Sequence, residues 1–156
     1  MHEIRIEPCR DAELLATMNR EIQEVHAAWY PREFKPWNQE ASTTFFNVML
    51  QDPNTFAWVA MRDEMALAYV IALVQNREEN AFRYAHKSLH IDQLSVNASF
   101  QRQGIGGQLL QHVIQWAAEQ KINRITIDHW AQNLAAATLY TQAGFTNYMY
   151  RMEKIK

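Results

Sequence analysis

The sequence predicts an α+β fold made of one domain over residues 1–156. A chain of 156 residues has the length of an ordinary domain and can bury a core of its own. Apolar residues recur with a period of two in some segments and of three to four in others, which indicates both strands and amphipathic helices. These segments follow one another as strand, two helices, three strands, helix, strand, helix and strand, an order that predicts one βαβ crossover.

The first part of the chain contains a strand followed by two helices. Residues 2–7 alternate between polar and apolar, as a strand does. Asp11 is an N-cap for a helix that we expect to end before Pro31. We expect Ser42 to cap a second, shorter helix that stops near Pro53.

The middle of the chain predicts a hairpin and a third strand. Residues 55–61 and 65–75 are apolar runs separated by a short charged turn, the pattern of two paired strands. Residues 76–86 are polar and form an exposed loop. Residues 88–96 are the strand that leads into a glycine-rich turn.

The last part of the chain alternates helices and strands. The helix after the glycine-rich turn has one apolar face and runs to about Gln120. Residues 124–130 are a strand and residues 133–143 a helix, with Gly144 at the position just past a helix C-terminus. Residues 146–155 are expected to form the last strand of the sheet.

Composition excludes several classes of protein. The formal net charge of −2 leaves no basic footprint for nucleic acid, and no apolar run is long enough for a membrane span. The first residues alternate in polarity and lack the pattern of a secretory signal. A single cysteine, Cys9, rules out an internal disulfide. We expect a cytoplasmic protein that binds neither nucleic acid nor membrane.

Three of the four glycines lie in one turn, at Gly104, Gly106 and Gly107. Glycine allows positive φ and a close approach of another molecule to the main chain. A glycine turn that opens a helix leaves N–H groups at the positive end of the helix dipole, where a phosphate binds readily. From the glycines alone, a tight strand-to-helix connection without a ligand is an equal alternative.

The turn reads Gln101-x-x-Gly104-x-Gly106 and resembles the Gln/Arg-x-x-Gly-x-Gly/Ala signature of the Gcn5-related N-acetyltransferase (GNAT) family. A second block at the expected distance resembles that family's second conserved block: Asn133-x-x-Ala136-x-x-Leu139-Tyr140-x-x-x-Gly144-Phe145. A Rossmann dinucleotide site is a competitor, but the motif lacks the third spaced glycine and follows a late strand. The resemblance implies a three-layer, mostly antiparallel mixed sheet of about six to seven strands, flanked by about four helices.

The resemblance implies that acetyl-CoA is the cosubstrate. Its pyrophosphate would bind the main chain of the turn, formed by Gln101, Arg102, Gln103, Gly104, Ile105, Gly106 and Gly107. The main chain of Leu94, Ser95 and Val96 would pair with the pantetheine arm like an added strand. Three residues of the second block, Asn133, Ala136 and Tyr140, would also contact the cosubstrate, although Asn133 is equally suited to capping the last helix.

The resemblance further implies direct transfer of an acetyl group to a primary amine, without a metal. Tyr140 occupies the position of the family's general acid, and a phenol pKa of about 10 is close to the value of about 8.5 for a thiol. Its alternative role is packing on a helix face. Asp92 is the best positional candidate for the general base, directly or through a water, and alternation groups it on one face with His90 and Leu94. The alternative is that Asp92 is simply an exposed strand residue.

The acceptor is not identified by the sequence. We expect His26, Trp29, Tyr30 and Phe34 to bind a small-molecule or peptide amine, because they bring together aromatic rings and a residue that titrates near neutrality. Trp37 and Phe45 would extend this aromatic wall; the alternative is a loop that packs its rings on the core. His129 is a further residue that would border the cleft. A homodimer is compatible with the family, and a noncatalytic acyl-CoA-binding or sensing module is the alternative function.

Overall fold

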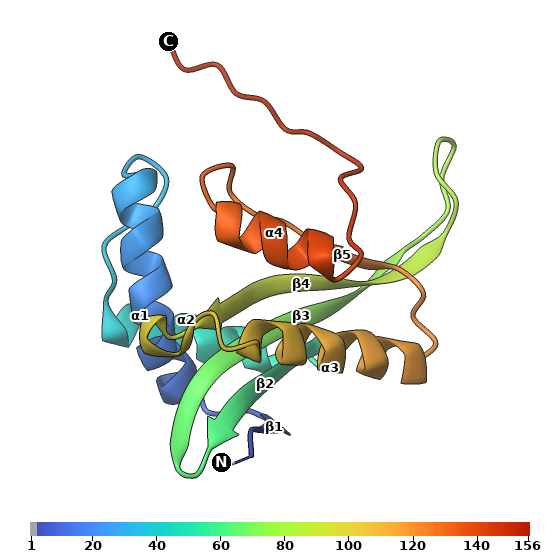
Figure 1. The fold of residues 1–156 in the computed structure, drawn as a ribbon. Helices are drawn as coiled ribbons and strands as arrows, with labels where there is room; N and C mark the ends of the chain where they lie inside the picture. The colour runs from blue at the N-terminus through green and yellow to red at the C-terminus, as the bar shows by residue number, and fades with distance from the viewer. Residues whose placement is uncertain (1–2) are drawn as a thin grey trace.

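In a computed structural model, the structure describes residues 3–156. Within this range one sheet has five strands in the order β1-β2-β3-β4-β5, with four α-helices around it (Figure 1). The strands are β1 (Arg5–Pro8), β2 (Thr55–Arg62), β3 (Met65–Arg77), β4 (His86–Val96) and β5 (Ile125–Ile127). The helices are α1 (Ala12–Trp29), α2 (Gln39–Gln51), α3 (Ile105–Glu119) and α4 (Leu134–Gln142). No helix in the described range is long and apolar enough to cross a membrane.

The sheet separates two hydrophobic clusters, which makes three layers. Leu15 of α1 and Phe46 of α2 pack with Tyr69 on one face. Leu109 and Val113 of α3 pack with the opposite face, where α4 also contributes. β1 to β4 pair antiparallel and β4 pairs with β5 in parallel, so the sheet is mixed and mostly antiparallel. The predicted fold class is therefore confirmed.

The number of strands differs from the prediction. Residues 3–156 contain five strands, fewer than the six to seven expected, and residues 146–155 form none of them. Tyr148 still packs under the guanidinium of Arg124, and the C-terminal end of the chain leads away from the sheet in an extended form (Figure 1). The alternation of residues 146–155 is that of a strand, but a strand exists only where a neighbour completes its main-chain hydrogen bonds.

Two of the three predicted helix N-caps, Asp11 and Asn133, are correct. The Asp11 carboxylate accepts a hydrogen bond from the N–H of Leu14 at 2.9 Å, as expected. The second helix is capped by Asn38, whose side chain accepts from the N–H of Ala41 at 2.8 Å, so the expected cap at Ser42 is wrong. Asparagine and serine are equally good caps, and the earlier residue adds a turn to the helix.

β4 contains a β-bulge at Asp92. Ile71 of β3 pairs with Gln93, and the next β3 residue pairs with Ile91, which leaves Asp92 as an extra residue. Ile91 and Leu94 consequently pack in the same core cluster. The predicted grouping, with Asp92 and Leu94 on one face and Ile91 on the other, assumed unbroken alternation and is wrong.

β4 and β5 separate at their carboxyl ends. Their parallel pairing stops at Ile91 and Ile127, although β4 continues to Val96. The strand expected over residues 124–130 is thus only three residues long. Because α3 and α4 follow these two strands, both helices begin at the same end of the sheet, where ligands commonly bind in α/β folds.

Candidate active site

Gly104 forms the N-cap of α3 in a conformation that favours glycine. Its φ is 80°, in the left-handed region. A Cβ at this position would meet no atom within 4 Å, so the space beside the turn is open. The predicted link between glycine and an unusual backbone conformation holds here.

The first turn of α3 differs from the other helix starts. Asp11, Asn38 and Asn133 each cap their helix with a side-chain hydrogen bond. Among the side chains described, none caps α3 in this way. The N–H groups of this turn, at the positive end of the dipole, are therefore available to an external anion.

The other two glycines of the turn serve different purposes. A Cβ on Gly106 would lie 3.2 Å from Leu139 and 3.4 Å from Val96, so Gly106 allows α4 and the end of β4 to pack closely. A Cβ on Gly107 would meet nothing within 4 Å. Ile105 is buried in the core cluster on the α3 side of the sheet.

The residues before Gly104 organise the turn. The Gln101 amide donates to the carbonyl of Val96 at 3.1 Å, and the Gln103 amide donates to the carbonyl of Ser99 at 3.5 Å. Arg102 is exposed and has a φ of 60°. Gln101 thus ties the turn to the end of β4, and the cation of Arg102 stands at the surface.

Beyond Ile91, the main chain of β4 faces the opening between β4 and β5 at alternate residues. The N–H of Asn97 donates to a β3 carbonyl at 2.9 Å. Main-chain groups alternate in direction along an antiparallel strand, so those of Ser95 also face β3, whereas those of Leu94 and Val96 face the opening. The bond from Gln101 to the carbonyl of Val96 agrees with this direction. Of the three residues predicted to pair with a ligand arm, Leu94 and Val96 are placed to do so through their main chains.

A partly buried polar network holds the bulge beside Asp92. The hydroxyl of Tyr69 donates to the side-chain carbonyl of Gln93 at 2.9 Å, and the Asn19 amide donates to that hydroxyl at 3.0 Å. Burial is the largest cause of the raised pKa of Tyr69, and the negative charge of Asp92 contributes to it. Asp92 is exposed, and it lies close enough to Tyr69 for its negative charge to contribute to the raised pKa of that residue.

Tyr140 lies in α4 and is 7% exposed. Its ring centroid is 6.2 Å from that of Phe145 and 6.1 Å from that of His129. Burial raises the pKa of Tyr140 to about 12. Tyr140 and His129 both line a small cavity of about 60 Å³ between β5 and α4. His129 follows a strand that pairs in parallel, and residues at the carboxyl ends of such strands commonly line binding sites. This position was the feature of the sequence that indicated its place here.

Asn133 caps α4, one of the two roles weighed from the sequence. Its side-chain carbonyl accepts a hydrogen bond from the N–H of Ala136 at 3.0 Å. Ala136 is partly buried against the core on the α3 side of the sheet.

The predicted aromatic residues gather around His26. The ring centroid of His26 is 4.8 Å from Phe34, 6.1 Å from Trp29 and 6.4 Å from Trp130. Tyr30 lies 4.7 Å from Trp130. We call these five residues the His26 cluster. Trp130 was not among the predicted site residues, and the only hint was its position at the end of the strand predicted over residues 124–130.

Burial lowers the pKa of His26, and its Nε2 atom is buried without a hydrogen-bond partner among the described residues. His26 is therefore neutral near pH 7. Two residues proposed for the same wall lie elsewhere. The Nε1–H of Trp37 donates to the carbonyl of Ala16 at 3.0 Å, and Phe45 on α2 packs against Phe46.

The loop after β5 joins the residues around Tyr140 to the His26 cluster. His129 packs beside Tyr140, and the next residue, Trp130, belongs to the His26 cluster. The loop before the glycine turn is also tied to α1, since the N–H of Ala98 donates to the Glu21 carboxylate at 2.7 Å. The region formed by the first turn of α3 and Tyr140 and the region formed by the His26 cluster are thus neighbours.

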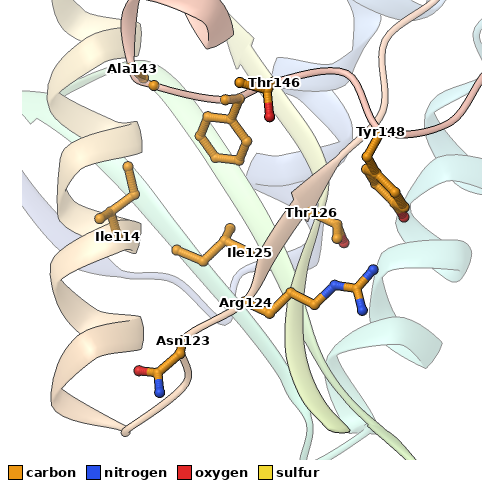
Figure 2. Close-up of a pocket in the computed structure, with 10 residues that line it drawn as sticks. Ile114, Asn123, Arg124, Ile125, Thr126, Ala143, Thr146 and Tyr148 are labelled. Carbon is orange, nitrogen blue, oxygen red and sulfur yellow. The ribbon is translucent and has the colours of Figure 1, made fainter. Parts of the chain in front are cut away.

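A wider hollow of about 500 Å³ lies at the outer edge of β5 (Figure 2). Its lining combines Ile114 of α3 and Ala143 at the end of α4, so it lies away from the first turn of α3. Within residues 3–156 no group of three or more His, Cys, Asp or Glu side chains is arranged to hold a metal ion.

Comparisons with known proteins agree with the sequence motifs. Residues 21–145 match the model of the acetyltransferase (GNAT) family. Human N-acetyltransferase 8 is 29% identical over 126 residues, which cover 76% of this chain and 53% of that protein. The chain thus spans about half the length of this curated relative.

Solved structures share the fold. A tetramutant of the BH1408 protein from Bacillus halodurans has a TM-score of 0.89 and 19% identity, with 99% of both chains covered. AAC(6')-Iy in complex with the bisubstrate analog CoA-S-monomethyl-acetylneamine has a TM-score of 0.76 and 16% identity, covering 99% of this chain and 98% of that one. The match over residues 21–145 spans most of the chain, which therefore belongs to the GNAT acetyltransferase family.

Proposed function

We propose that the protein is an acetyl-CoA-dependent N-acetyltransferase that transfers an acetyl group to a primary amine by direct attack. One observation carries the proposal: the opening between β4 and β5 ends at a helix whose first turn begins on glycine and keeps its N–H groups available. Membership of the GNAT family supports the same function.

The residues at the opening fit acetyl-CoA. The first turn of α3 offers N–H groups to the pyrophosphate, and the open space beside Gly104 and Gly107 leaves room for it. Arg102 adds a cation at the surface of the turn. The outward main-chain groups of Leu94 and Val96 bind the pantetheine arm as a strand binds its neighbour.

Acetyl-CoA supplies the acetyl group as a thioester, and the chain provides stabilisation of charge. The N–H of Leu94 donates to the carbonyl oxygen as negative charge develops there, a contribution of about 3 kcal/mol for one such donor. The amine nitrogen forms its bond to the carbonyl carbon as the carbon–sulfur bond breaks. The bulge at Asp92 sets the direction of the Leu94 N–H, and the network of Tyr69 and Gln93 holds that bulge in place.

Tyr140 acts on the departing sulfur. Because burial raises its pKa to about 12, its hydroxyl stays protonated across the pH range of an assay. It donates a hydrogen bond to the sulfur as the bond breaks. Its proton is held more tightly than that of a thiol, whose pKa is about 8.5, so this hydrogen bond is its main contribution to the rate.

The His26 cluster binds the acceptor amine next to the residues that act on the thioester. Aromatic faces attract an ammonium group and pack against the apolar part of a small-molecule or peptide amine. His26 remains neutral in this surrounding, so it adds no positive charge that would repel an ammonium group. Asp92, exposed at the bulge, removes the proton of the amine directly or through a water.

Two measurements test the proposal: calorimetric binding of acetyl-CoA, and thiol release from acetyl-CoA with a panel of amines. We expect binding, together with thiol release that depends on the amine. Binding without turnover over a broad panel would instead favour a noncatalytic acyl-CoA-binding module. Absence of binding would contradict the donor site itself.

A further inference from the structure

His129 lies beside Tyr140, just beyond the carboxyl end of β5. The two ring centroids are 6.1 Å apart, and the ring planes are tilted by 52°. His129 is exposed, whereas Tyr140 is buried in α4. An imidazole that exchanges protons with solvent is therefore the neighbour of a phenol that is almost enclosed.

A hydrogen bond determines which ring nitrogen of His129 is free. Its Nδ1 lies 3.2 Å from the carbonyl oxygen of Trp130. A carbonyl oxygen can only accept, so Nδ1 carries the hydrogen of this bond. Nε2 of the neutral ring then has a lone pair, and Nε2 of the cationic ring has a proton to donate. Nε2 is thus the atom at which His129 takes up and releases a proton.

The small cavity between β5 and α4 connects His129 with Tyr140. Its volume is about 60 Å³, whereas roughly 10–15 Å³ is enough for one water. Thr126, Thr141 and Asn147 also line it and provide the polar partners that a water needs. The Tyr140 hydroxyl has no hydrogen-bond partner within residues 3–156 and is not sealed from water. A water in this cavity can therefore bridge the two side chains.

The proposed reaction needs a proton that Tyr140 by itself does not release. The carbon–sulfur bond breaks with both electrons on sulfur, and a thiol pKa of about 8.5 means that the sulfur takes up a proton near pH 7. Burial raises the pKa of Tyr140 to about 12, so losing its own proton would leave a phenolate more basic than the thiolate. An imidazolium is ordinarily a stronger acid than a thiol. A proton that starts on an imidazolium therefore reaches the sulfur in a favourable direction.

We propose that His129 supplies the proton of the departing thiol, through a water in the cavity and the hydroxyl of Tyr140. This inference rests on the proposed function. As the carbon–sulfur bond breaks, the hydroxyl proton moves to the sulfur and the water passes a proton to the phenol oxygen. Nε2–H of His129 replaces the proton that the water has lost. The products are a thiol, an intact phenol and a neutral imidazole, which regains its proton from solvent.

Other titratable groups surround this end of β5 and must be separated from His129. They are Asp128 beside it in the chain, Asp92 and His90 on β4, His26 and Tyr30 at the end of α1, Tyr140 on α4 and Tyr148 after it. Carboxylates and phenols ordinarily titrate outside the range from pH 5 to 8. Burial lowers the pKa of His26, which leaves His90 as the imidazole that needs a control.

The pH dependence of kcat tests the relay. His129→Asn keeps an amide N–H for the carbonyl of Trp130 and removes the nitrogen that titrates. We expect its kcat to be reduced roughly 10²-fold at pH 6, the lower end for one general acid. The ratio of parent to variant kcat should then decrease toward one above pH 8, as the imidazolium is lost. Protonation of the amine acts on both proteins alike and cancels in the ratio.

His90→Asn is the matched control. It removes an imidazole from the paired part of β4 and β5 and keeps an amide for the hydroxyl of Thr126, which lies 2.9 Å from Nδ1 of His90. The ratio of parent to control kcat should be the same at every pH.

A measurement without acetyl-CoA tests the link between the two side chains. The protein is made with tyrosine that is isotope-labelled at Cζ for NMR, and Tyr140→Phe identifies the signal of Tyr140. We expect this signal to shift between pH 5 and 8 in the parent and in His90→Asn, because His129 changes charge in that range. The shift should be absent in His129→Asn.

The outcomes distinguish this inference from the proposed function. A ratio of parent to His129→Asn kcat that is constant with pH would leave His129 a structural role and overturn the relay. A Tyr140 signal that shifts equally without His129 would also overturn it. If no amine gives turnover although the signal shifts as expected, the proposed function fails, and the transfer of a proton to sulfur fails with it.

Discussion

α3 and α4 begin at the same end of the sheet, yet their first turns are built in opposite ways. α4 begins on Asn133, whose side chain accepts from the N–H of Ala136 at 3.0 Å. α3 begins on Gly104 with a φ of 80°, and among the described side chains none caps it. One turn is satisfied by its own chain, whereas the other is left for an external acceptor of hydrogen bonds. In the proposed function α3 binds the cosubstrate and α4 contributes Tyr140 to the chemistry.

The largest expected effect comes from Tyr140→Phe, which removes the hydroxyl and keeps the ring that packs in the core. Since one hydrogen bond to a group that gains charge in the transition state contributes roughly 10²-fold to the rate, we expect kcat to fall by about that factor. Binding of CoA, which depends on α3, should be unchanged in calorimetry. An unchanged kcat under conditions where chemistry limits the rate would remove Tyr140 from the mechanism.

A second experiment compares Gly104→Ala with Gly144→Ala. Both glycines have positive φ and open space where a Cβ would lie, so both substitutions strain the backbone by roughly 1–2 kcal/mol. Urea unfolding should show similar losses of stability. Only Gly104→Ala should also weaken CoA binding, by about tenfold if roughly 1.4 kcal/mol of contact is lost. Equal affinities in the two variants would contradict the assignment of the α3 turn.

Asn133→Ala tests the side-chain cap at the N-terminus of α4. Loss of the cap should lower the free energy of unfolding by about 1 kcal/mol, measured with urea. Asn133→Asp is the matched control, because aspartate caps equally well and suits the positive end of the helix. An alanine variant as stable as the aspartate variant would show that the hydrogen bond to Ala136 contributes nothing to stability.

The smallest effect concerns His26, which lies apart from both helix starts. Burial lowers its pKa below the ordinary value of about 6.5, so the unfolded chain binds a proton more readily than the folded chain. Stability is therefore highest above pH 6.5 and decreases as the pH falls through the lowered pKa. His26→Asn should reduce the loss in the free energy of unfolding between pH 7 and 5, measured with urea. His112, whose pKa burial also lowers, should account for a slope that remains; an unchanged slope in the variant would contradict the shift at His26.

The local features of the fold that were predicted correctly depend on short-range rules. The Asp11 and Asn133 caps, the positive φ of Gly104 and the positive φ of Gly144 each follow from a residue and its immediate neighbours. Trp130 could not be placed beside His26 in the same way, because their contact joins the end of α1 to the loop after β5. The bulge at Asp92 was missed for a related reason, since its position depends on how β3 aligns with β4.

By itself, the sequence determined the mixed α+β layout, the two motifs and the helix that opens on glycine. These features are local, because periodicity, capping and backbone freedom act within a few residues. Tertiary structure alone decided which β4 main-chain groups face the opening and which rings surround His26. It also decided that residues 146–155, despite their alternation, are not a strand of their own sheet. A strand requires a partner with which to share hydrogen bonds, and the choice of partner is not encoded in the segment that needs one.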